Sequence, residues 1–190
     1  MKKILHMFAA LVLTLPGMST PSQATVTAFF SAGTSCTGTN SVSYAPGGAS
    51  VKVSLCLTST VEYICGLSYR FVPEIATANN LFQIAGRDLA APFLDPNNTV
   101  TFPLPIVTPA VGDLGATVDT LAECTLPNGT YRVATYDISA NASATASTYT
   151  IALDPAFASV DVASQPVVSA ITEARISAGF ILRSGSGTSP

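Results

Sequence analysis

Residues 51–58 of this 190-residue chain have the sequence VKVSLCLT, in which apolar and polar side chains alternate. Successive side chains of a β-strand point to opposite faces, so this period of two predicts a strand with one buried and one wetter face. The apolar side carries Val51, Val53, Leu55 and Leu57, and the wetter side carries Lys52, Ser54, Cys56 and Thr58.

Similar runs follow along the chain. The next one, Val61 to Val72, places alternate residues such as Leu67, Tyr69 and Phe71 on one side. Gly, Pro, Asn or Asp interrupts the chain every eight to twelve residues, which is typical of short strands in a sandwich or barrel. About nine strands are expected in all, the others at 26–30, 100–107, 117–124, 131–138, 149–153, 159–163 and 176–183.

Two segments need a separate prediction. Pro103 and Pro105 lack the amide hydrogen of a sheet ladder, so the run at 100–107 is expected to be an edge strand. Asn79 to Asp88 is the one stretch where a short helical turn competes with a strand. No internal repeat of fixed period is present.

The first residues have the features of an export signal. Lys2 and Lys3 precede an apolar run from Ile4 to Leu15, and Ser22-Gln23-Ala24 forms a small-x-small cleavage site. The apolar run is too short to span a bilayer. The sequence therefore predicts a signal peptide at 1–24, a single sandwich domain at 25–183 and a flexible polar tail at 184–190, in a secreted or periplasmic protein.

The chain has four cysteines, at Cys36, Cys56, Cys65 and Cys124. An even number of cysteines in an exported protein indicates disulfides, because the compartments outside the cytoplasm are oxidising, so two disulfides are expected. Three pairings are possible. If Cys56 and Cys65 face each other on a tight hairpin they pair together, which leaves Cys36 with Cys124. A zinc cluster is the rival interpretation, but no CxxC pair or histidine supports it.

Charge excludes several classes of function. Charged residues make up 10% of the chain and the net charge is −3, so no strongly basic surface is expected. Nucleic-acid binding needs clustered cations and is excluded, and attraction to an anionic membrane has no support. The only histidine, His6, lies in the predicted leader. Histidine-dependent nucleophilic catalysis is therefore not expected, and the scattered carboxylates are predicted to serve turns rather than catalysis.

Ligand-binding candidates are few. Asp95, Asn97 and Asn98 offer oxygen atoms in one compact loop, where calcium is possible but a plain Pro-Asn turn explains the same residues. No cofactor is otherwise predicted. Sugar-binding surfaces commonly use aromatic platforms, and the chain has no Trp. Tyr44, beside a Pro-Gly-Gly turn, is the tyrosine expected to be exposed.

Several segments together resemble the cohesin family and related carbohydrate-binding β-sandwich modules. The likeness rests on pattern and strand order over most of the mature chain, through Val26–Phe29, Tyr44–Val53, Leu67–Phe71, Tyr131–Ile138, Tyr149–Asp154, Ser159–Val162 and Ile176–Ile181. The resemblance implies an all-β, nine-stranded jelly-roll (Ig-like) sandwich. For cohesins it also implies dockerin binding.

These observations give three hypotheses. The leading one is an exported, non-catalytic binding module that recognises a protein partner or a surface glycan, with Tyr44, Asp95, Asn97 and Asn98 as candidate contacts. The alternative is a structural surface or fimbrial-type subunit that assembles through sheet edges. An enzyme with paired carboxylates ranks last.

Overall fold

The computed structural model describes residues 26–60, 64–95, 100–118, 126–145, 147–154, 157, 159–162, 174–176 and 180–184. Within them lie fourteen strands and one short 3-10 helix, η1 (Ala76–Ala78). Nine strands were too few, because five of the fourteen have only two or three residues and leave little pattern in the sequence. No helix in these ranges is long and apolar enough to cross a membrane.

The strands form a larger sheet and two smaller ones. The six-stranded sheet has the order β13-β1-β3-β10-β6-β8, and the four-stranded sheets have the orders β2-β14-β11-β5 and β12-β4-β9-β7. The strands are β1 (Val26–Ala32), β2 (Ser41–Tyr44), β3 (Val51–Ser59), β4 (Ile64–Ser68), β5 (Phe71–Pro73), β6 (Phe82–Leu89), β7 (Phe93–Leu94), β8 (Leu104–Pro105), β9 (Ala116–Val118), β10 (Gly129–Ala140), β11 (Thr148–Leu153), β12 (Ser159–Val162), β13 (Ala174–Ile176) and β14 (Phe180–Ser184).

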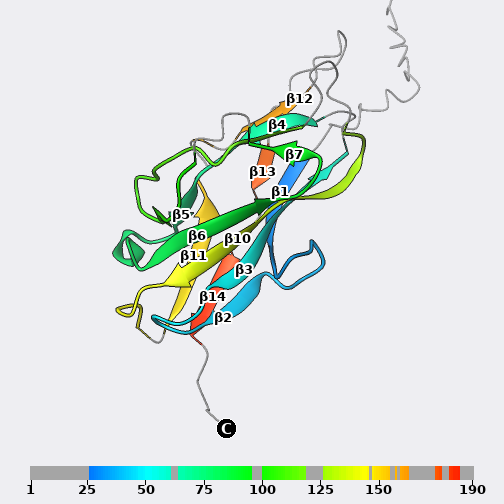
Figure 1. The fold of residues 1–190 in the computed structure, drawn as a ribbon. Coiled ribbons are helices and arrows are strands. Elements are labelled where there is room, and N and C mark those ends of the chain that lie inside the picture. The colour runs from blue at the N-terminus through cyan, green and yellow to red at the C-terminus, as the bar shows by residue number, and fades with distance from the viewer. Residues whose placement is uncertain are drawn as a thin grey trace, which may run out of the picture.

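The sheets enclose one aromatic core. In Figure 1, β6, β10 and β3 run side by side, with β11 and β14 partly behind them and β12, β4 and β7 at the top of the view. Phe71 of β5 packs edge-on against Phe30 of β1 and Tyr136 of β10, with ring centroids 5.1 and 4.7 Å apart. Such contacts between layers confirm an all-β sandwich, because each sheet buries one face against another.

Strand β3 differs from its sequence pattern in one respect. Val53, Leu55 and Leu57 enter the core as expected, but Ser54 and Cys56 on the opposite side are also buried. The segment that follows β1 covers this side, because Cys36 bonds to Cys56 (S–S 2.07 Å) and Ser54 Oγ donates to Gly33 O at 2.8 Å. Periodicity within a strand carries no information about a distant loop that covers it.

The disulfide also corrects the hairpin pairing. Cys56 is on β3, which pairs with β1 and β10, whereas Cys65 is on β4, which pairs with β12 and β9. The two cysteines belong to different sheets, so the expected Cys56–Cys65 bridge is wrong. Cys65 is itself disulfide-bonded, and Cys124 lies outside the described residues.

Other predicted elements are confirmed, divided or wrong. The proline-containing run keeps only β8, which lies at the edge of its sheet as expected. The runs at 61–72 and 176–183 each contribute residues to two strands rather than one, and 61–63 and 177–179 lie outside the described ranges. The helical turn at 79–88 is wrong, because Phe82 and Ile84 alternate with exposed Gln83 and form β6.

Two tyrosines meet in the middle of the core. The hydroxyl groups of Tyr69 and Tyr136 share a short hydrogen bond, and both side chains are almost completely buried. Burial raises the pKa of Tyr69 to about 12 and raises the pKa of Tyr136 well above the usual value of 10.0. The folded chain therefore holds both phenols neutral.

Peptide mapping without reduction tests the disulfides. With Cys36 bound to Cys56, the remaining cysteines are Cys65 and Cys124, so we expect the oxidised protein to yield Cys36–Cys56 and Cys65–Cys124 peptides. Recovery of a Cys56–Cys65 peptide from folded protein contradicts the sheet assignment.

The tyrosine pair predicts a loss of stability in alkali. Unfolded tyrosines ionise near pH 10, whereas Tyr69 and Tyr136 in the folded chain do so only at higher pH. Their contribution to the free energy of unfolding is present below about pH 10 and is lost progressively as the pH rises towards about 12. Urea unfolding at a series of pH values measures how steeply the free energy of unfolding falls with pH. Tyr69→Phe is expected to make this fall shallower. A slope that Tyr69→Phe leaves unchanged contradicts the assignment.

Candidate functional site

An exposed leucine marks one sheet face. Three large apolar side chains in the described ranges are exposed, namely Ile75, Leu94 and Val111. Ile75 and Val111 lie in loops, whereas Leu94 lies on strand β7 and is 46% exposed. A strand residue has a direction fixed by the sheet, so Leu94 is a better candidate for an organised binding surface than a loop residue.

The register of the sheet shows which residues surround Leu94. Leu94 pairs with Thr117 of β9, and Thr117 pairs with Gly66 of β4. The preceding residues Phe93 and Ala116 are buried in the core, so Leu94 and Thr117 point outward together. We call the surface formed by Leu94 and Thr117, with Gly66 buried beside them, the β7–β9 face.

Gly66 is buried next to Thr117. A Cβ atom at Gly66 would meet the carbonyl oxygen of Ala116 at 2.9 Å, the Cα of Thr117 at 3.3 Å and the Cγ2 of Thr117 at 3.4 Å. Strands β4 and β9 therefore approach too closely for any other residue without a backbone shift. The exposed part of the face is an apolar anchor beside a hydroxyl group.

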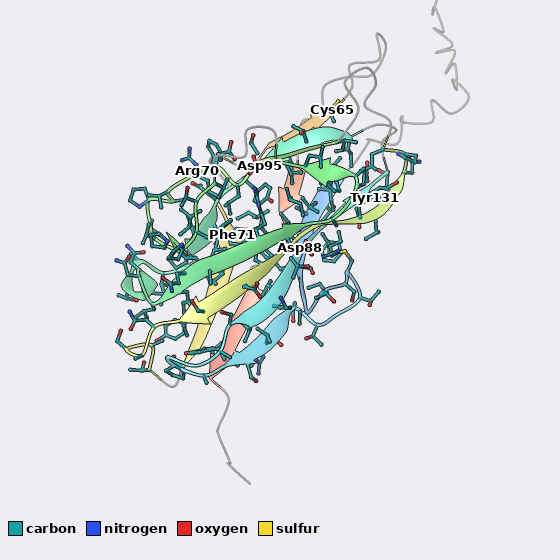
Figure 2. All side chains as sticks on the ribbon, in the orientation of Figure 1. Cys65, Arg70, Phe71, Asp88, Asp95 and Tyr131 are labelled. Carbon is teal, nitrogen blue, oxygen red and sulfur yellow. A yellow bond between two sulfur atoms is a disulfide. The ribbon has the colours of Figure 1, made fainter. Side chains whose placement is uncertain are left out.

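The buried side chain of Arg87 holds the end of strand β7 in place from the interior of the sandwich. Arg87 lies on β6, in register with Tyr136, and its side chain is only 5% exposed. Its guanidinium donates to Leu114 O at 2.8 Å and forms an ion pair with Asp95 at 2.5 Å. Asp95 follows Leu94 directly, so the ion pair secures the end of β7 to the opposite layer. In Figure 2, Asp95 and Cys65 lie towards the end of the molecule that carries β4 and β7.

The electrostatics of this anchor are balanced. Burial by itself lowers the pKa of Arg87. The electrostatic interactions with Tyr136, Tyr69 and Asp95 are together larger, so the pKa of Arg87 lies above its usual value. The guanidinium therefore stays charged. Asp113 completes the support, because its Oδ1 accepts hydrogen bonds from the backbone N–H groups of Tyr69 and Gly115 at 3.2 and 2.9 Å.

The sequence candidates do not assemble into one site. Tyr44 is 4% exposed, because its ring packs against Phe82 and its hydroxyl donates to Thr145 O at 2.9 Å, so the expected exposure is wrong. Asp95 is held by Arg87. Asn97 and Asn98 lie outside the described residues, so the calcium hypothesis stays a prediction. Among the residues the structure describes, no group of three His, Cys, Asp or Glu side chains is placed to hold a metal.

The outer face of the six-stranded sheet is polar and largely self-paired. Lys52 Nζ lies 2.8 Å from Asp137 Oδ1, and Thr58 and Thr130 share a hydrogen bond of 2.9 Å. Arg132 donates to Thr135 Oγ1 at 2.7 Å and lies 3.6 Å from Asp88. Because these groups already satisfy one another, a partner must disrupt existing contacts to bind here.

The buried anchor predicts unequal effects for two ion pairs. We expect Arg87→Met to lower the free energy of unfolding by about 3–5 kcal/mol, because it removes the cation from a buried ion pair with Asp95. The control Lys52→Met removes an exposed ion pair and is expected to cost less than about 1 kcal/mol. Urea denaturation of both variants gives the comparison, and equal losses contradict the anchoring role.

No protein-family model matches the chain, and no curated protein matches it in sequence. Solved structures do match in fold. The third cohesin of ScaC from Acetivibrio cellulolyticus, solved in complex with the ScaB dockerin, aligns with a TM-score of 0.54 at 16% identity, over 84% of this chain and 98% of that one.

Two further structures agree. CaCohA2 from Clostridium acetobutylicum aligns with a TM-score of 0.53 at 17% identity, over 86% of this chain and 93% of that one. The seventh type I cohesin of ScaB from Pseudobacteroides cellulosolvens aligns with a TM-score of 0.53 at 10% identity, over 88% and 95%. The sandwich described above is therefore a cohesin-like β-sandwich module.

Proposed function

We propose that this chain is an exported, non-catalytic module that binds another protein through the β7–β9 face. The observation that carries the proposal is the exposed, sheet-borne Leu94 beside Thr117 and Gly66. The fold supports the same conclusion, because one cohesin with this architecture was solved in complex with a dockerin. A dockerin-like protein is accordingly the partner class that we propose.

The chemistry of the face suits protein recognition. Interfaces are centred on a few apolar anchors that enter a pocket of the partner, with polar groups around them. Leu94 provides the anchor, and exposed Thr117 provides a neighbouring hydroxyl. Gly66 is buried beside Thr117 and lets strands β4 and β9 approach each other closely. Asp95 is engaged with Arg87, so the anchor sits on a restrained strand end.

The proposal of a non-enzyme rests on what the candidate catalytic groups do. Asp95, Asp137 and Asp88 have cationic neighbours in Arg87, Lys52 and Arg132. The only histidine, His6, belongs to the predicted leader. Export is supported by that leader and by the Cys36–Cys56 disulfide, because structural disulfides persist in oxidising compartments.

Site-specific photo-crosslinking tests the face. A benzoylphenylalanine at Thr117 is expected to capture a partner from the secreted proteins of the source organism, because Thr117 lies beside Leu94. The matched control places the same group at Thr130, an exposed threonine of the six-stranded sheet, and is expected to capture none. A captured protein with dockerin-like sequence supports the proposal. Capture at Thr130 but not Thr117, or at neither position, contradicts it.

Substitution of the anchor gives a quantitative test with the captured partner. Leu94→Asp is expected to weaken binding at least about tenfold, because it places a charge in the desolvated centre of the interface. Val111→Asp is the control, since Val111 is 47% exposed and Leu94 is 46% exposed. It is expected to leave the affinity unchanged. Calorimetric titration measures both, with circular dichroism as the check on folding, and equal losses refute the assignment.

The oligomeric state of the purified protein distinguishes the proposed binding module from the alternative of a structural subunit. A subunit that polymerises through sheet edges self-associates as its concentration rises, whereas a binding module remains monomeric without its partner. Gel filtration over a range of concentrations distinguishes them.

A further inference from the structure

A second surface feature lies away from the β7–β9 face, at the start of β6. It is a hollow of about 340 Å³ lined by Asn80, Leu81, Phe82, Gln83, Pro105 and Asn141. Three of these six side chains are exposed amides, and none is ionisable. The volume falls in the range of about 300–1,000 Å³ that is usual for small-ligand sites.

Hydrogen bonds between the contributing segments hold the walls of the hollow in place. Asn141 N donates to Leu81 O at 2.7 Å, and Ile106 N donates to Phe82 O at 2.9 Å. Asn79 and Thr108 exchange two hydrogen bonds, of 3.1 and 2.8 Å, between the Asn79 side-chain amide and the Thr108 backbone. The turn before β6 and the segment after β8 are thereby joined, so the hollow exists before any ligand arrives.

The amides are presented in defined ways. Gln83 is the register neighbour of Pro105 on β8, which places an amide beside a flat apolar ring. Asn141 Oδ1 accepts from both the N–H and the hydroxyl of Ser143, at 3.0 Å each. Its oxygen is thus occupied locally, and its NH₂ group is the part left to donate outward. Asn80 has a positive φ of 62°, which a side-chain amide tolerates better than most residues.

The geometry points to a binding site for a neutral mono- or disaccharide in this hollow. Sugar hydroxyls both donate and accept hydrogen bonds, and amides offer both functions on one side chain. The apolar C–H face of a pyranose ring fits against Pro105 and Leu81. A charged ligand finds no counter-ion among the lining residues. This site uses a different surface and a different chemistry from the β7–β9 face, so neither proposal depends on the other.

Nuclear magnetic resonance of the folded full-length mature chain tests the site. The probes are glucose, galactose, mannose and N-acetylglucosamine, with their disaccharides cellobiose, lactose, mannobiose and chitobiose. At least one is expected to shift the side-chain amide resonances of Gln83 and Asn141. If none does, or if only glucuronic acid or an uncharged blocked dipeptide does, the saccharide assignment is overturned.

Substitutions of lining residues test whether the sugar that shifts these resonances binds in the hollow. Gln83→Ala is expected to weaken binding of the responding sugar about five- to tenfold, the usual effect of losing one hydrogen bond. Asn80→Gly removes the amide while keeping the positive φ, and is also expected to weaken binding. Leu94→Asp is the control and leaves sugar binding unchanged, whereas Gln83→Ala leaves partner capture unchanged. Sugar affinity that is the same in all three variants refutes the location.

Discussion

The guanidinium of Arg87 extends from the six-stranded sheet into the interior of the sandwich, where it binds Asp95 and the carbonyl oxygen of Leu114. A cation that is 5% exposed is tolerated only when acceptors surround it, and these acceptors come from the segments next to β7 and β9. Strand β7 itself contributes just two residue pairs to its sheet. The buried ring of Phe93, the two ladder pairs and this buried charge together fix the position of Leu94.

The strands with strong alternation could be predicted from sequence, and the site could not. The core residues of β3 and β11 follow the period of two, as Val53, Leu55 and Leu57 show in β3. β10 follows it from Ala134 to Ala140, after an irregularity in the register at Arg132/Ala134. β6 lies in the stretch 79–88, where a helical turn was expected to compete with a strand. No sequence pattern reveals that Arg87 is satisfied across the core. Leu94 lies in a two-residue strand beside Pro92, which is too short to show any periodicity.

Two of the sequence candidates make long-range contacts that local sequence does not predict. Tyr44 was expected to be exposed beside a Pro-Gly-Gly turn, and Asp95 was expected to offer oxygen atoms in a compact loop. In the folded chain each has a partner from a distant segment: Thr145 O accepts from Tyr44, and Arg87 binds Asp95. Likewise, Ser54 and Cys56 on the polar side of β3 are buried, and Cys36 is bonded to Cys56 from a loop twenty residues earlier. Local sequence predicts where a side chain points, but long-range contacts decide whether it remains accessible.

The order of the strands in space has a consequence for assembly. β1 and β2 are the first strands to be synthesised, yet β1 pairs in parallel with β13 and β2 pairs in parallel with β14. Neither sheet can close until the last strands are available, so the earliest strands wait with open edges while the rest of the chain is made. Such long-range pairing is slow to form and leaves the edges prone to wrong associations.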